Sequence, residues 1–109
     1  MKVSDLINSG LFELVNEGSN TDRDISKLFC CDMLSIAMSR APSACAWVTV
    51  MGNINTLAVA SLSDAACIVL AEGVRLDDPA TAKAASQGIT VFRTDMPIFE
   101  AALLIHDKL

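Results

Sequence analysis

The sequence lacks the features by which several classes of protein are recognised. Its eight basic residues are scattered and the net charge is −5, so the basic surface that nucleic-acid binding requires is missing. Polar residues interrupt even the most apolar window, 54–71, whereas a membrane span needs about 20 mostly apolar residues. The first residues carry no continuous apolar stretch like that of a secretory signal. We therefore expect a cytoplasmic protein without nucleic-acid or membrane partners.

The motifs of metal and phosphate chemistry are missing as well. The four cysteines contain no C-x-x-C pair, and His106 is the single histidine, so we expect no metal site. Cys67 lies inside an apolar run, which is typical of a reduced thiol packed as a small hydrophobic side chain. There is neither a Walker A motif nor a G-x-G-x-x-G motif. His106 sits near the end of the last expected helix, where an exposed histidine is ordinary. We expect no catalytic residues and no cofactor, and hence a non-enzymatic protein.

Two short apolar runs, 47–50 and 67–70, organise what is present. Both are rich in β-branched residues and lack polar alternation, as strands covered on both faces of a sheet do. The segment between them has about fifteen residues, the length of a helical crossover between parallel neighbours. The two runs therefore predict a right-handed βαβ unit at the centre of a parallel sheet.

The other elements follow from turn and cap residues. The first half is expected to contain a helix capped by Ser4 and ended by Gly10, strand 11–15, a polar loop over 16–24, strand 25–31, and a helix capped by Asp32 and ended by Pro42. After strand 47–50 we expect a helix capped by Asn53 or Asn55. A further helix, with Asp78 at the N-cap and Pro79 at the first position, is expected to end at Gly88, before strand 89–92 and a C-terminal helix through Phe99, Leu103 and Leu104. The predicted fold is α/β, one small domain over 1–109 with a mainly parallel open sheet of β/α units and helices on both faces.

The apolar content is high for a small domain, with 52% hydrophobic residues. The expected helix after Asn55, through Leu57, Val59 and Leu62, is nearly all small or apolar, so we expect it to be buried on more than one side, as core or as the interface of a homodimer. Trp47 within a buried strand favours the core, although aromatic residues are also enriched in interfaces.

A ligand site is expected beyond the carboxyl ends of the parallel strands, where short Gly/Asn turns and helix N-termini favour a small anion such as a nucleotide. Helix capping alone also explains these residue types. The candidate ligand-binding residues are Asp32, Ser35, Gly52, Asn53, Asn55, Glu72, Gly73, Thr94 and Asp95.

Three segments, Asp32-Met33-Leu34-Ser35-x-x-Met38, Trp47 to Val50, and Asn55-x-x-Ala58-Val59-Ala60, together resemble the DRTGG domain. Later segments, Glu72-Gly73, Asp78-Pro79 and Thr94-Asp95, fit the same pattern in register. This chain has Asp24-Ile25-Ser26-Lys27-Leu28 where the family often has a Thr-Gly-Gly-like turn. The resemblance implies a regulatory or accessory α/β module, found beside CBS domains and in some pyrophosphatases and phosphotransacetylases, with no catalytic residue set. Two functions are favoured: a homodimeric regulatory module with a small anionic ligand, and a purely structural protein–protein interaction module. A hydrolase acting on phosphorylated compounds is a third and weaker alternative.

Overall fold

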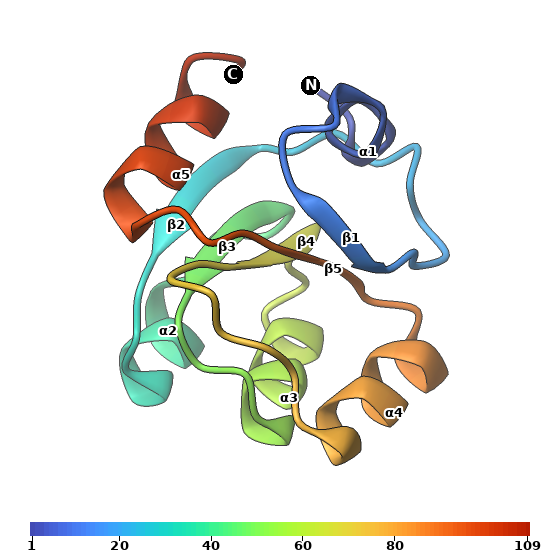
Figure 1. The fold of residues 1–109 in the computed structure, drawn as a ribbon. Coiled ribbons are helices and arrows are strands. Elements are labelled where there is room, and N and C mark those ends of the chain that lie inside the picture. The colour runs from blue at the N-terminus through green and yellow to red at the C-terminus, as the bar shows by residue number, and fades with distance from the viewer.

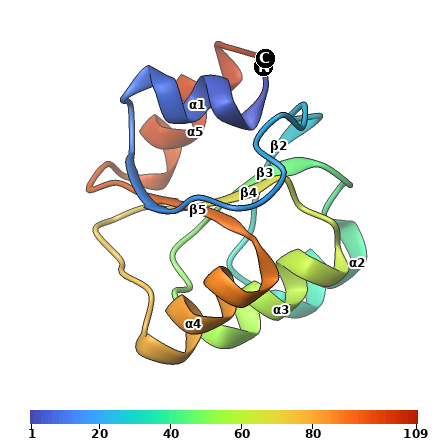
Figure 2. The same ribbon diagram turned by 90° about the vertical axis from the view of Figure 1, so that its right-hand side faces the viewer.

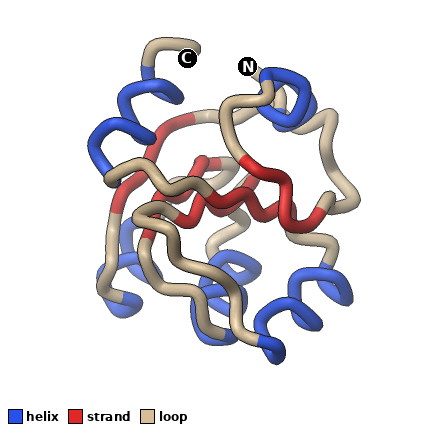
Figure 3. The backbone as a smooth tube through the Cα atoms, viewed as in Figure 1, coloured by secondary structure: helices blue, strands red, loops and turns tan.

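Five strands form one sheet in the order β1-β5-β4-β3-β2. The computed structural model describes all 109 residues (Figure 1). The strands are β1 (Glu13–Asn16), β2 (Lys27–Cys30), β3 (Cys45–Thr49), β4 (Cys67–Leu70) and β5 (Thr90–Arg93). Strands β2, β3, β4 and β5 are parallel neighbours, and β1 pairs antiparallel with β5. The strands therefore make a central layer with β1 and β2 at its two edges (Figure 3).

Helices cover both faces of this sheet. They are α1 (Val3–Ser9), α2 (Leu34–Arg40), α3 (Ile54–Leu62), α4 (Asp78–Gln87) and α5 (Ile98–His106). Figure 2 shows α1 and α5 on one face and α2, α3 and α4 on the other. The predicted fold class is thus confirmed as a small α/β domain with a mainly parallel sheet. No helix has both the length and the apolar character needed to cross a lipid bilayer.

The predicted central βαβ unit is confirmed as β3-α3-β4. Strands β3 and β4 are parallel neighbours, with Trp47 opposite Ile68, and every residue of both strands is buried. Trp47 lies in the core as expected, and its indole Nε1 donates a hydrogen bond to the carbonyl of Cys31 at 2.9 Å. That bond satisfies the one polar atom of the largest buried side chain.

Each face of the sheet has its own apolar core, because side chains alternate along the central strands. The core under α1 and α5 includes Val48, Val69 and Phe92. The core under α2, α3 and α4 includes Trp47 and Ile68. The sheet is therefore covered on both sides, which explains strands without polar alternation.

Three predicted N-caps are wrong by one or two positions. Helix α1 starts at Val3 after Lys2, and Ser4 lies inside it and donates its N–H to the carbonyl of Thr21. Helix α4 is capped by Asp77, whose carboxylate accepts the N–H of Ala80 at 2.9 Å, so Asp78 is its first residue. The third is Asp32: α2 is preceded by Met33 with no side-chain cap, since the Asp32 carboxylate bonds to β3 instead.

The predicted helix ends at glycine are confirmed. Gly10 and Gly88 both adopt left-handed backbone conformations, with φ of 71° and 65°, after α1 and α4. Helix α3 packs between α2 and α4 and buries Leu57 and Val59, as expected for core, whereas Leu62 at its end is 73% exposed and is not part of the core of this chain.

Candidate functional site

The sequence-predicted ligand residues fall into two groups along the carboxyl edge of the sheet. The chain leaves β4 toward α4 on one face and leaves β5 toward α5 on the other (Figure 2). Connections that diverge in this way open a ligand crevice in many α/β sheets. The structure brings Glu72 and Gly73 to Thr94 and Asp95 at this point.

The crevice is closed by hydrogen bonds between the two loops. The N–H of Gly73 donates to the carbonyl of Thr94 at 3.0 Å, and the N–H of Glu72 donates to the carbonyl of Met96 at 2.9 Å. The Glu72 carboxylate accepts the N–H of Ile98 at 3.0 Å and so caps α5. These groups already have partners within the chain, and no cavity opens between them.

Arg93, at the end of β5, ties the same loops together and was missed in the sequence. Its side chain is only 10% exposed and donates to the carbonyl of Gly73 at 3.2 Å and to Asp95 at 2.9 Å. A weaker contact at 3.4 Å joins it to Glu13 on β1. One buried arginine therefore links β1, β5 and the loop after β4, and a charged residue ending an apolar strand was the available signal.

The second group lies at the ends of β2 and β3. The Asp32 carboxylate accepts hydrogen bonds from the Thr49 hydroxyl at 2.8 Å and from the N–H of Val50 at 2.9 Å. It thereby joins the ends of two strands. Ser35 is exposed in the first turn of α2, and its carbonyl accepts the hydroxyl of Ser39.

The turn before α3 holds two asparagines, of which Asn53 is hydrogen-bonded within the chain and Asn55 is not. The side-chain oxygen of Asn53 accepts the N–H groups of Asn55 at 3.0 Å and Thr56 at 3.2 Å, so Asn53 is the N-cap. The exposed side chain of Asn55 has no hydrogen-bond partner. Gly52 is required by close packing, since a Cβ there would lie 2.3 Å from the carbonyl oxygen of Arg75.

The charge along this edge is mainly negative. Two cations are present, Arg75 and Arg93, and only Arg75 is free of an ion pair. The acidic groups are Glu13, Asp32, Glu72, Asp77, Asp78 and Asp95, of which Glu13 and Asp95 contact Arg93. This balance disfavours an anion at most of the edge. Arg75, whose backbone carbonyl packs against Gly52, is the one exposed cation there without an ion pair.

An apolar groove lies elsewhere, between α5 and the edge strand β2. Its volume is about 200 Å³, and it is lined by Leu28, Phe99, Ala102, Leu103 and His106. Phe99 is 70% exposed, although it is the largest apolar side chain on α5. Strand β2 pairs only with β3, so its outer edge carries backbone groups without a strand partner. The spacing of Phe99 and Leu103, off the buried positions 101, 102 and 105, could have indicated this face.

The four cysteines are unpaired, and two of them are buried. Burial raises the pKa of the Cys45 thiol to about 11, and burial together with the nearby Cys45 raises the pKa of Cys67 to about 12. Burial also raises the pKa of Cys30, and Asp32 adds to that rise. Neutral thiols are poor nucleophiles and poor metal ligands, and the two buried cysteines, Cys45 and Cys67, pack as small apolar groups in the core. No three His, Cys, Asp or Glu side chains are grouped as metal ligands would be.

Comparison with known proteins adds no assignment. No protein-family model matches the chain, and no curated protein matches it significantly. The DRTGG resemblance therefore stays a prediction, carried by the residue pattern alone.

Proposed function

We propose that the protein is a non-enzymatic accessory module that acts through protein–protein contact, as a homodimer joined across strand β2 and the outer face of α5. The observation that carries this proposal is the apolar groove beside an unpaired strand edge, with Phe99 and Leu103 exposed on its helical side. Large exposed apolar side chains beside an open strand edge are costly unless a partner covers them. An accessory role agrees with what the DRTGG resemblance implies.

A second copy of this chain fits the groove by symmetry and charge. An edge strand that pairs with itself in antiparallel fashion gives a closed two-fold dimer and extends the sheet. In that arrangement Lys27, at the start of β2, lies toward Asp32 of the other copy. The α5 helices also run antiparallel, so Glu100 in the first turn of one helix faces the end of the other, where Lys108 lies. Opposite charges therefore meet at the ends of β2, whereas the end of α5 carries both Asp107 and Lys108.

The test is sedimentation equilibrium of the intact chain and of variants with a polar residue in the groove. We expect a dimer for the natural sequence and a monomer for Phe99→Ser combined with Leu103→Ser, since core apolar anchors carry most of the free energy of an interface. Circular dichroism of both proteins establishes that the variant is folded.

Leu62→Ser is the matched control. Leu62 is 73% exposed at the end of α3, in the helical layer on the other face of the sheet. The substitution therefore removes a similar exposed apolar side chain without changing the groove. This variant is expected to stay dimeric. A natural chain that is monomeric at every concentration, or a dimer that Leu62→Ser dissociates while the groove variant does not, contradicts the proposal.

A small anionic ligand, such as a nucleotide, is the second candidate, at the carboxyl edge beside α3. Its support is Arg75, which is exposed, forms no ion pair and packs its backbone carbonyl against Gly52, together with the exposed amide of Asn55 in the first turn of α3. A thermal-shift screen with AMP, GMP and phosphate tests it, and Arg75→Gln should abolish any shift. If none of these compounds raises the melting temperature, the protein–protein interaction module remains as the single proposed function.

The proposal also places the protein in the cytoplasm. Four unpaired thiols, of which Cys30 is exposed, are typical of a reducing compartment.

A further inference from the structure

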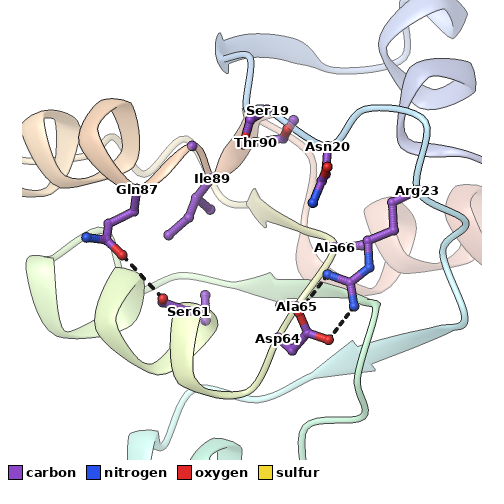
Figure 4. Close-up of a pocket in the computed structure, with 12 residues that line it drawn as sticks. Ser19, Asn20, Arg23, Ser61, Asp64, Ala65, Ala66, Gln87, Ile89 and Thr90 are labelled. Carbon is purple, nitrogen blue, oxygen red and sulfur yellow. Dashed lines mark hydrogen bonds and ion pairs between the residues drawn. The ribbon is translucent and has the colours of Figure 1, made fainter.

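A polar cavity of about 140 Å³ opens at the amino-terminal edge of the sheet, opposite the edge at which the ligand was expected. Figure 4 shows how separate segments build it: the loop after β1, the end of α3 with the turn into β4, and the end of α4 with the turn into β5. The side chains that decide its chemistry are Ser19, Asn20, Arg23, Ser61, Asp64 and Gln87. A cavity of about 150 Å³ is known to hold a six-membered ring.

The wall formed by the loop after β1 is held by backbone contacts. The N–H of Ser19 donates to the carbonyl of Gly88 at 3.1 Å, and the N–H of Gly18 donates to the hydroxyl of Thr90 at 2.9 Å. Gly88 has a φ of 65°, and a Cβ there would lie 2.4 Å from the Ser19 hydroxyl oxygen. The cavity is therefore largely formed before any ligand arrives, which lowers the cost of ordering it.

The cavity carries no free cation. The guanidinium of Arg23 donates to both carboxylate oxygens of Asp64, at 2.8 and 2.5 Å, and the hydroxyl of Ser43 donates to the same carboxylate at 2.6 Å. The two charges cancel within the chain. The C-terminal ends of α3 and α4 also point here, and helix C-termini are partially negative. Phosphates and other anions are thus disfavoured.

Uncharged hydrogen-bonding groups with spare capacity dominate the rest of the lining. The side-chain amide of Asn20 has no partner in the chain and extends toward the cavity (Figure 4). Gln87 accepts the hydroxyl of Ser61 at 3.4 Å and keeps its NH₂ group free. No aromatic side chain lines the cavity, so a nucleobase would find no stacking surface.

From this lining we infer that the cavity binds a small neutral polyhydroxyl compound, of the size of a triol to a monosaccharide or cyclitol. Hydroxyl groups both donate and accept, which matches amides and hydroxyls on a wall without net charge. This inference is independent of the proposed dimer, because the cavity shares no residue with the groove between β2 and α5.

The experiment is a titration of ¹⁵N-labelled intact protein with glycerol, D-ribose and myo-inositol, followed by amide chemical shifts. We expect at least one of these three compounds to shift, in a saturable manner, the side-chain amides of Asn20 and Gln87 and the backbone amide of Ser19. Inorganic phosphate, as the anionic probe, should leave these signals in place. Absence of saturable shifts at these positions with all three compounds, or a larger response to phosphate, overturns the inference.

Two variants and two controls separate a loss of binding at the cavity from other effects of substitution. Asn20→Ala and Gln87→Ala should each weaken the binding by about fivefold, the effect of one net hydrogen bond. Asn8→Ala removes an exposed amide on α1, outside the cavity, and should bind as the natural chain does. The Phe99→Ser and Leu103→Ser chain should also bind unchanged, so loss of the dimer and loss of the cavity's ligand are distinguishable. Equal affinity in all four proteins contradicts the assignment.

Discussion

Helices α3 and α5 have the same length and a similar apolar composition, but their surroundings differ. Each has nine residues, mostly apolar. Helix α3 lies between α2 and α4 and is covered by its own chain on three sides, whereas α5 shares its face of the sheet only with α1 and leaves Phe99 in solvent beside β2 (Figure 2). The comparison teaches that apolar composition indicates a buried helix without indicating what buries it. The sequence left α3 open as core or as a dimer interface, and the interface that we propose lies instead at α5.

The largest effect should come from the inner face of α3. Leu57 is fully buried and Leu62 is 73% exposed on the same helix. Leu57→Ala should lower the free energy of unfolding by about 2–5 kcal/mol, because it leaves a cavity, and Leu62→Ala should change it by less than about 0.5 kcal/mol. Urea unfolding of both variants measures the difference. Equal losses would mean that the end of α3 is covered after all.

The outer face of α5 should matter only through association. If two copies cover Phe99, the melting temperature of the natural chain rises with protein concentration, and a partner at about 100 times its dissociation constant adds about 2.7 kcal/mol. The Phe99→Ser and Leu103→Ser chain should melt at one temperature throughout. Thermal melts over a wide range of concentration measure this. A concentration-independent melting temperature for a natural chain that remains monomeric would remove the contrast between α3 and α5.

The two helix N-termini differ in where their caps come from. Asn53 caps α3 from the adjacent position, while Glu72 caps α5 from a loop 26 residues away. Asn53→Ala and Glu72→Ala should each cost about 1 kcal/mol. Asn55→Ala is the control and should cost almost nothing, since its side chain has no partner. Chemical unfolding of the three variants measures these losses, and a large effect of Asn55→Ala would point to a packing role.

The pattern of the chain predicted the elements better than their ends. Strands β3 and β4 and the helix between them were predictable because continuous apolar runs and a crossover-length gap depend on local sequence. The caps predicted at Ser4 and Asp32 were wrong because both residues form hydrogen bonds with groups far away in the sequence. Asp32 is drawn to the Thr49 hydroxyl, 17 residues along the chain, and this competition leaves no trace in the local pattern.

The sequence predicted where the candidate residues lie in the fold but not the hydrogen bonds that they make. The predicted topology correctly placed Glu72 and Gly73 near Thr94 and Asp95. It did not predict the hydrogen bonds that join the two loops. The polar cavity lies at the opposite edge and is built from segments as far apart as Asn20 and Gln87. A cavity built from such distant segments can be recognised only when the three-dimensional positions of its loops are known.

The smallest effect should come from the end of α3, where Asp64 has no equivalent on α5. Asp64 has a φ of 60°, and asparagine tolerates this left-handed conformation, so Asp64→Asn removes the charge with little backbone cost. Hydrogen bonds from Arg23 and Ser43 lower the pKa of Asp64 below its ordinary value of 3.8. A lowered folded-state pKa stabilises the protein above the unfolded-state value, and the stabilisation is lost as pH falls through the folded-state pKa. At pH 7 the variant should therefore be less stable by no more than about 1 kcal/mol, because the pair is largely exposed. Urea unfolding of both proteins from pH 7 down to pH 2 should show the two stabilities converging below about pH 4. A difference that stays constant over this range would mean that the carboxylate is not held by Arg23, and that α3 ends as freely as α5 does.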